Sequence, residues 1–385
     1  MKAHWYNDKV IRGYIWQAAV LLTLVASLVF FIRNASENMV KAGIASGFQF
    51  LWRNSGIDVP FDITGYSPSG TIFSLFWAGV GNTLFVSALA IILATLLGFL
   101  IGLARLSSHW LLSSLAGAYV EFVRNIPLLF FVIFWYFGVI ASLPQPKDSI
   151  SVLDLFFLNN RGLTIPRPTD GTAFVWAWGF IIALAFLQWG LARISAKQRA
   201  QSGTGFPSGL SAIVTLGIAP VLALAMAVFV TGWDVPVAGK FNLRGGTVLI
   251  PEFVALLVAL VTYSAGFIAE IVRGGLLAVS RGQREAAAAL GLRPSQALWL
   301  VVVPQAMRIM IPPMTSQYLN ILKNSSFGAA IAYPELVSVF MGSALNNTGQ
   351  AIEIIAMVLA VYLFFGLIVS FAMNLFNKRM ALVTR

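Results

Sequence analysis

Long apolar runs separated by short polar segments dominate the chain, and each run approaches the ~20 residues with which a helix crosses a bilayer. They predict an all-α integral membrane protein with about eight transmembrane helices. Three polar segments between the runs, 33–72, 142–172 and 232–250, are rich in Gly, Pro, Asn and Asp, and we expect loops or short lids there. The predicted spans are 14–32, 77–103, 118–141, 173–192, 211–231, 251–275, 305–322 and 351–376.

Basic residues gather on one side of these spans. If the amino terminus lies in the cytoplasm, the cytoplasmic segments hold 16 of the 25 Lys and Arg residues but only 4 of the 14 acidic residues. Cytoplasmic loops of membrane proteins carry such an excess, so both termini are predicted to be cytoplasmic. The net charge of +11 then reports topology, and we expect membrane lipid rather than nucleic acid around the chain.

The composition offers little for catalysis. Cysteine is absent, and the two histidines, His4 and His109, lie in separate segments. We find no phosphate-binding loop of the G-x-x-x-x-G-K-[ST] type and no nucleophile–base or metal constellation. The sequence therefore predicts a protein that is not an enzyme and carries no cofactor or metal of its own.

A distinctive segment, 281–304, lies on the predicted cytoplasmic side. An alanine-rich helix should run to Leu290, and Gly291 suits the left-handed residue that closes it. Pro294 can begin a second helix, which should stop or kink at Pro304. Two short helices joined by a glycine make a compact knob that could carry force from a soluble partner. The candidate coupling residues are Arg284, Glu285, Ala286, Ala287, Gly291, Pro294 and Pro304.

Two pairs of opposite charges lie in or beside apolar spans, where an unpaired charge costs at least ~2.5–3.5 kcal/mol. Glu270 and Arg273 share a helix face, either as a local ion pair that anchors the helix end or as part of a gate or path. Glu121 and Arg124 repeat this spacing, and Pro127 then breaks the backbone ladder. That break could expose groups that bind substrate, or it could be a tolerated membrane proline.

A third candidate for the substrate path is the polar run at the end of the seventh predicted span. An α-carboxylate needs hydrogen-bond donors and an α-ammonium needs acceptors, and this run offers both. The alternative is a snorkelling lysine beside a polar helix terminus. The run consists of Lys323, Asn324, Ser325 and Ser326.

Several motifs together resemble the polar amino-acid permeases of ABC importers. The knob has the spacing of their EAA loop, E-A-A, three residues, G, nine residues, aliphatic-x-aliphatic-P. Arg293 stands where that family commonly has a capping Ser, which predicts the loss of a cap worth about 1 kcal/mol. The remaining similar motifs are Gly81-Asn82-Thr83-Leu84, the E-x-x-R-x-x-P-L-L run from Glu121, the helix from Tyr263 through Glu270 to Gly275, and the run from Lys323 to Ser326.

This resemblance implies a MetI-like core of an ABC importer type I permease in two parts, 77–141 and 251–376. An added span and outside loop would occupy 1–76, and a cytoplasmic tail 377–385. An insertion at 142–250 would carry the spans 173–192 and 211–231. The extended form is similar to the larger permease subunit of general L-amino-acid importers.

The implied protein imports L-amino acids, mainly polar ones, across a bacterial inner membrane. Its implied partners are two cytoplasmic ATPase subunits that bind ATP and Mg²⁺, a second and shorter permease, and a periplasmic amino-acid-binding protein. An ion-driven secondary transporter or channel is the alternative. It should show carboxylates for a coupling ion in mid-span, and the spans contain few.

Overall fold

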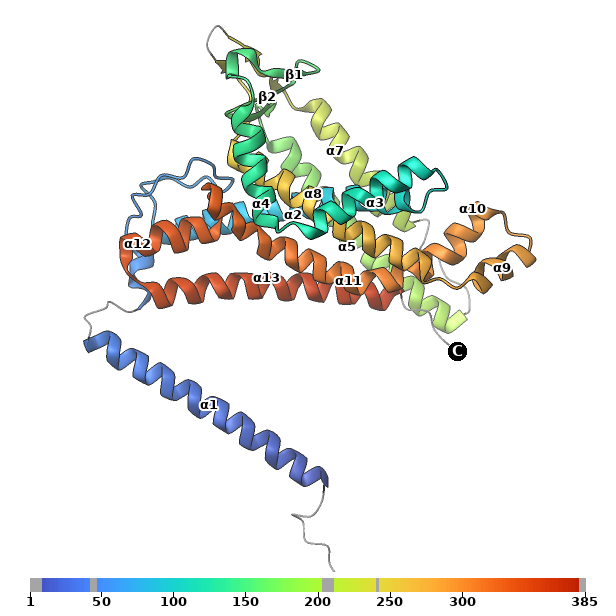
Figure 1. Ribbon diagram of the computed structural model, residues 1–385, viewed down its shortest axis with the longest axis horizontal. Coiled ribbons are helices and arrows are strands. Elements are labelled where there is room, and N and C mark those ends of the chain that lie inside the picture. The colour runs from blue at the N-terminus through green and yellow to red at the C-terminus, as the bar shows by residue number, and fades with distance from the viewer. Residues whose placement is uncertain (1–8, 42–46, 203–210, 240–241, 381–385) are drawn as a thin grey trace, which may run out of the picture. The chain divides into compact units, whose positions relative to one another are not determined.

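Helices make up most of the protein, as the sequence predicts. The computed structural model describes residues 9–41, 47–202, 211–239 and 242–380 (Figure 1). The α-helices are α1 (Lys9–Lys41), α2 (Ile72–Arg105), α3 (Trp110–Asn125), α4 (Leu128–Ile133), α5 (Thr172–Ser202), α7 (Ala219–Val230), α8 (Pro251–Leu277), α9 (Arg281–Ala289), α10 (Pro294–Ala297), α11 (Val303–Asn324), α12 (Leu345–Thr348) and α13 (Ala351–Met380).

Shorter helical pieces of other geometry connect them. The π-helical pieces are η3 (Phe134–Val139), η6 (Ile213–Ile218), η7 (Leu298–Val302) and η9 (Val337–Ala344). The 3₁₀ pieces are η2 (Phe48–Trp52), η4 (Ile140–Ser142), η5 (Pro146–Asp148) and η8 (Ser325–Ile331).

Among the described residues, six helices are long and apolar enough to cross a membrane. A bent pair, α3 with the helical run from Leu128 to Ser142, raises the number to seven. The span predicted at 211–231 is a shorter apolar helix, Val214–Val230, and at 1.5 Å per residue it reaches only about 26 Å. The described ranges thus hold six or seven full-length candidates where the apolar runs predicted eight.

The predicted third span, 118–141, is not one straight helix. The backbone turns by 106° between Asn125 and Leu128. Ile126 has extended angles (φ −113°, ψ 131°) because the ring of Pro127 disfavours helical geometry at the preceding residue. The expected break at Pro127 is confirmed, and it divides the span into two helices.

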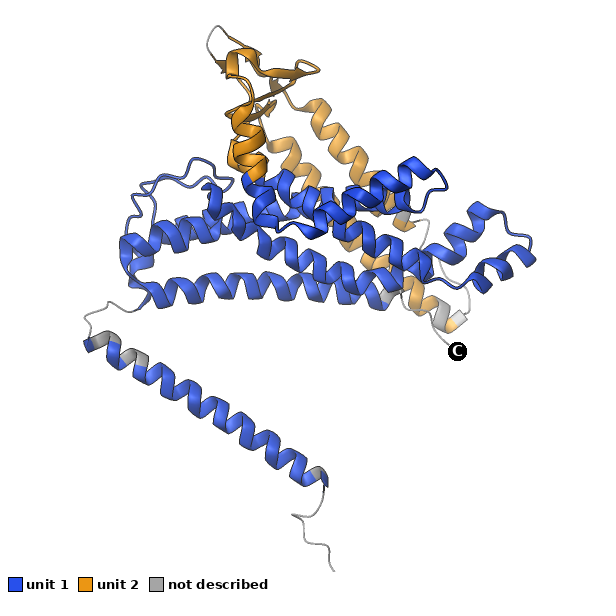
Figure 2. Ribbon diagram, in the orientation of Figure 1, with its two compact units in different colours: residues 1–133, 256–385 blue, residues 134–255 orange. Residues whose placement is uncertain are grey.

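The chain forms two compact units, coloured separately in Figure 2. Unit 1 comprises Met1–Ile133 and Leu256–Arg385, and unit 2 comprises Phe134–Ala255. In unit 1, α13 runs along α11, and α2 packs against both α3 and α11. Its core joins η2, α2, η9 and the start of α13 through buried side chains that include Phe50, Leu75, Val80, Leu336, Phe340 and Ile354.

Two glycines allow α2 to approach α8 closely. A Cβ at Gly98 would lie 2.6 Å from Ile268 Cβ, and one at Gly102 would lie 2.8 Å from the carbonyl oxygen of Ala269. Such i, i+4 pairs of small residues let helix backbones meet in a membrane. The G-x-x-x-G spacing of this pair thus serves close packing of the two helices.

Unit 2 contains a small sheet that the sequence did not predict. The segments 142–172 and 232–250 were expected to be loops, but their strands pair antiparallel in the order β1-β2-β3-β8. The first hairpin turns at Leu153 (φ 55°) and Asp154 (φ 52°), without the Asn-Gly signal that marks such turns in sequences. The strands are β1 (Ile150–Val152), β2 (Phe156–Asn159), β3 (Gly162–Ile165), β4 (Arg167–Pro168), β5 (Trp233–Asp234), β6 (Val237–Ala238), β7 (Leu243–Arg244) and β8 (Thr247–Leu249).

Gly98→Ala should lower the free energy of unfolding by about 1–3 kcal/mol, because the added methyl group forces α2 away from Ile268. The matched control is Gly117→Ala in α3, where a Cβ meets nothing within 4 Å. There alanine should gain up to about 1 kcal/mol of helix propensity. Thermal unfolding in detergent measures both. Equal midpoints for the two variants would contradict the close contact between α2 and α8.

Candidate functional site

The segment 281–304 begins as two short helices joined at a glycine. Gly291 has φ 75° and follows α9. The N–H of Leu292 donates to the carbonyl of Ala287 at 3.1 Å, and the N–H of Gly291 donates to that of Ala288 at 2.9 Å. These paired bonds form a Schellman motif, which satisfies the last carbonyl groups of α9. Pro294 then begins α10, so the predicted glycine joint and the predicted second start are both confirmed.

The second helix does not stop at Pro304. From α10 the backbone passes through η7 into α11, and Pro304 lies in the first turn of α11. In a regular α-helix the proline ring clashes with the carbonyl four residues earlier. The wider π-helical turn of η7 lies directly before it and accommodates the ring. The helix therefore does not stop at Pro304, and a kink there, the other expectation, stays a prediction.

The start of α10 also keeps part of its cap. The side chain of Arg293 has no acceptor, as the sequence implied. The Oε1 atom of Gln296, however, accepts the N–H of Arg293 at 2.9 Å. This bond is the half of a capping box that the residue at the third helical position supplies.

Polar bonds attach this two-helix knob to the helices on either side. The Nη2 atom of Arg284 donates to the carbonyl of Leu276 in α8 at 3.3 Å. The Nε2 atom of Gln305 in α11 donates to Oε1 of Gln283 at 3.0 Å. Ala287 is buried, whereas Glu285 and its neighbour Ala286 are exposed. One face of the knob is therefore held against α8 and α11, and the opposite face is exposed.

Glu270 in α8 bonds to two arginines. The Nη2 atom of Arg273 lies 2.6 Å from Oε1 of Glu270, and Nη1 of Arg105, at the end of α2, pairs with Oε2. The side chains are 17–32% exposed, so these pairs are only partly shielded from solvent. The local pair expected from the sequence is present. The pairing with Arg105 was not expected, and it makes the cluster a bond between helices.

The other candidates for the substrate path do not join this cluster. Glu121 and Arg124 are exposed on α3, and the described part of the chain contains no ion pair between them. The guanidinium carbon of Arg124 instead lies 5.8 Å from the ring centre of Phe267, one turn before Glu270. A role for either residue in transport stays a prediction.

The hydroxyl groups of the polar run 323–326 donate hydrogen bonds to backbone carbonyls of the same helix end. The hydroxyl of Ser325 donates to the carbonyl of Leu322 at 2.7 Å, and that of Ser326 to the carbonyl of Lys323 at 2.8 Å. Ser325 is buried, Lys323 is exposed and Asn324 is half-buried. In this conformation the bonds fit a polar helix end, and the run's role in the path also stays a prediction.

A buried polar cluster follows this run, between the candidate spans Pro294–Ile331 and Ala351–Lys378. At its centre the fully buried Glu335 accepts the N–H of Val337 at 2.9 Å and of Ser338 at 2.7 Å. The hydroxyl of Tyr362 in α13 donates to Glu335 Oε2 at 3.2 Å. Burial raises the pKa of Glu335 to about 7, although these three donors oppose the rise.

Sequence reasoning missed this cluster. A Glu at the start of a short helix reads as an ordinary capping residue, and its burial depends on contacts with residues about 250 positions earlier. Asn82 and Thr83 did stand out, but only as part of a motif.

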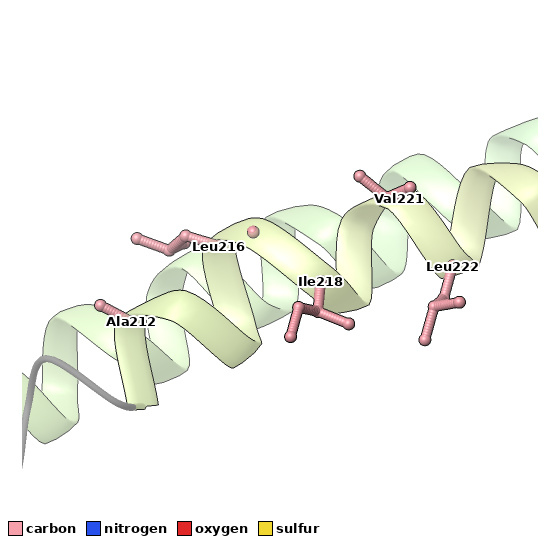
Figure 3. A pocket seen from close by; sticks show the side chains of 6 residues that line it. Ala212, Leu216, Ile218, Val221 and Leu222 are labelled. Carbon is pink, nitrogen blue, oxygen red and sulfur yellow. The ribbon is translucent and has the colours of Figure 1, made fainter. Parts of the chain in front are cut away.

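A depression of about 690 Å³ lies on η6 and α7 in unit 2. Its side chains project from a single helical run in Figure 3, and all of them are apolar. Such a surface suits lipid and offers no donor or acceptor to a polar solute. The lining residues are Ala212, Leu216, Gly217, Ile218, Val221 and Leu222.

Comparisons with known proteins cover nearly the whole chain. The family of binding-protein-dependent transport system inner membrane components matches residues 208–382. The putative amino-acid ABC transporter permease protein YhdX of Escherichia coli K12 is 45% identical over 99% of this chain and 97% of its own length. This chain belongs to the amino-acid ABC transporter permeases.

Two further permeases of this family have the same extent. The general L-amino acid transport system permease protein AapQ of Rhizobium johnstonii is 44% identical over 98% of this chain and 94% of its own. The glutamate/glutamine/aspartate/asparagine transport system permease protein BztB of Rhodobacter capsulatus is 38% identical over 98% and 96%. The permease thus shares its extended form with these relatives, and it is a multi-pass membrane protein.

Glu270→Gln should destabilise the permease more than Arg105→Gln or Arg273→Gln does. Loss of the carboxylate leaves two adjacent guanidinium groups without a counter-charge, whereas loss of one arginine leaves an intact pair. Because the cluster is partly exposed, we expect a loss of about 1–3 kcal/mol, below the range for a fully buried pair. Thermal unfolding of the three variants measures this order. A loss from Arg273→Gln as large as that from Glu270→Gln would contradict it.

Proposed function

We propose that this chain is the membrane-spanning subunit of an ATP-driven importer that carries polar L-amino acids into the cytoplasm. Its similarity to permeases of amino-acid ABC transporters along nearly the full chain carries this proposal. AapQ is named for a general L-amino acid transport system, and BztB for a system that transports glutamate, glutamine, aspartate and asparagine. These names support a broad range of polar substrates.

ATP is hydrolysed by two separate cytoplasmic ATPase subunits that dock on residues 281–304. The geometry of the knob supports this role, because Glu285, Ala286 and Leu290 are exposed while Ala287 is packed inward. A force on this exposed face would reach α8 through Arg284 and Leu276, and α11 through Gln283 and Gln305. The knob therefore connects a docking surface to two transmembrane helices.

The complete assembly contains a second permease and a substrate-binding protein. The second permease is a shorter relative that completes the path, and the binding protein delivers substrate on the periplasmic side. The excess of Lys and Arg on one side of the spans supports an orientation in the bacterial inner membrane with both termini in the cytoplasm. The substrate passes between the permeases, near the break between α3 and α4, the charged end of α8 and the polar end of α11.

Site-directed cross-linking tests the docking surface. The chain has no cysteine, so Glu285→Cys introduces a unique thiol on the knob. In native membrane vesicles it should cross-link to a nucleotide-hydrolysing subunit. The matched control is Leu153→Cys, because Leu153 is 81% exposed on the hairpin of unit 2 that we place outside. If the thiol at position 285 captures no such subunit, or both thiols capture it equally, the proposal fails.

Gly291→Val should uncouple transport without preventing membrane insertion. A β-branched residue is strained at φ 75°, so the joint between α9 and α10 must distort. We expect amino-acid uptake and substrate-stimulated ATPase activity to fall at least about tenfold, which corresponds to a coupling change of ~1.4 kcal/mol.

The matched control for this prediction is Gly282→Val. Neither glycine has a neighbour within 4 Å of an added Cβ, and only Gly291 has a positive φ. The control should therefore retain most of the uptake. Wild-type uptake by Gly291→Val would show that the joint does not transmit force.

A further inference from the structure

Glu335 is a buried carboxyl group without a counter-charge. It is 0% exposed, and in the described part of the chain it forms no ion pair. Its partners are two backbone N–H groups and one tyrosine hydroxyl. A buried charge stabilised only by neutral donors is expensive, so such a group gains by taking up a proton.

The segment around Glu335 is bonded to α2 at three points. The Nδ2 atom of Asn82 donates to the carbonyl of Pro334 at 2.9 Å, and the hydroxyl of Tyr333 donates to the carbonyl of Asn82 at 3.0 Å. The N–H of Leu336 donates to Oγ1 of Thr83 at 3.0 Å. These bonds join α2 to the residues on both sides of Glu335.

Two further bonds extend the joint to α13 and to the outer segment before α2. The hydroxyl of Tyr362 reaches Glu335 from α13. Asn82 donates a second time, to the carbonyl of Phe61 at 2.8 Å. Four parts of unit 1 therefore meet around one carboxyl group.

We propose that Glu335 is a positioning residue that fastens the segment 333–344 to α2 and α13, and that this joint tightens when its carboxyl group takes up a proton. In the charged form, the carboxylate caps η9 but keeps a charge in an apolar site. In the neutral form, its oxygens still accept the two N–H groups, and its new O–H donates to the hydroxyl of Tyr362. The cap is kept and the buried charge is removed.

The titratable groups that face Glu335 are Tyr333 on its own segment and Tyr362 on α13. From α2 and η8 the facing groups are Asn82, Thr83 and Ser325, which do not titrate. The pKa of about 7 fits this environment. The pKa of Glu335 in the folded state lies above its ordinary value of 4.5. The stability that the protonated carboxyl group contributes is therefore full below pH 4.5 and is lost as the pH rises through about 7.

For transport, the inference rests on the proposed function. The joint follows α11, the helix that continues from the knob, and the 3₁₀ piece η8 connects the two. A tighter joint would hold the end of α11 against α2 and α13. Uptake by the assembled transporter should then depend on pH between about 6 and 8 through this one group.

Thermal unfolding of the purified full-length permease between pH 5.5 and pH 8.5 tests the joint. The wild-type midpoint should fall as the pH rises through about 7. Glu335→Gln imitates the neutral form, so its midpoint should stay level and exceed the wild-type midpoint at pH 8.5. The two proteins differ only at position 335, so every other group is common to both slopes. Equal pH slopes for the two proteins would overturn the proposal.

Two further variants keep the test decisive. Glu353→Gln removes the other buried glutamate, which accepts the N–H of Gly47, and it should retain the wild-type slope. Tyr362→Phe removes a charge-assisted bond to the carboxylate, which is stronger than the bond that the neutral form makes to the same hydroxyl, so it should move the transition to higher pH. A transition at lower pH in Tyr362→Phe would overturn the proposal even if Glu335→Gln does not fold.

The unfolding result does not depend on the transported solute. If the assembly imports no amino acid, wild-type uptake is absent at every pH, while the difference in pH slope persists. The failure of the proposed function and the failure of the proton-dependent joint can therefore be distinguished.

Discussion

The close approach of α2 to α8 is the constraint on which the rest of unit 1 depends. Lipid chains are as apolar as leucine, so membrane helices gain little from apolar contact alone and associate through close packing and polar bonds. Gly98 and Gly102 provide the packing, and the ion pairs of Glu270 with Arg105 and Arg273 close the contact at its end. The same helix, α8, then meets α11 at Gly275, beside Ala306 and Met310. One helix thereby holds both neighbours through small residues.

Polar bonds mark the two ends of this helical framework. At one end the knob is bonded to α8 and α11 through Arg284 and Gln283. At the other, the cluster around Glu335 joins α2, η9 and α13. Between them, α2 and α13 are largely apolar.

Features set by local chemistry could be predicted from the sequence. Gly291 and Pro294 determine their own backbone geometry, and the pair Gly98 and Gly102 has a spacing with one common use in membranes. Most of the helices follow from apolar runs of sufficient length. The bend at Pro127 was also visible, because proline restricts the residue before it.

Features set by distant contacts could not be predicted in this way. Arg105 pairs with a carboxylate 165 residues later, and Leu336 is bonded to Thr83 across 253 residues. Neither partner can be found from spacing along one helix. The hairpin at Leu153 and Asp154 was missed because its turn uses residues that rarely adopt positive φ. The candidate site was thus predictable at the knob. It was unpredictable at Glu270 and Glu335, where residues far apart in the sequence bond to one carboxyl group.

The π-helical turn before Pro304 has a mechanical consequence. A proline in regular α-geometry would bend the chain there and make a hinge, which absorbs torque. The wider turn accepts the ring, so the helical backbone from Pro294 to Asn324 stays unbroken. In the proposed function, a push on α10 would therefore pass into α11 along a continuous helical backbone, in which Pro312 and Pro313 are the next positions that lack a backbone N–H donor.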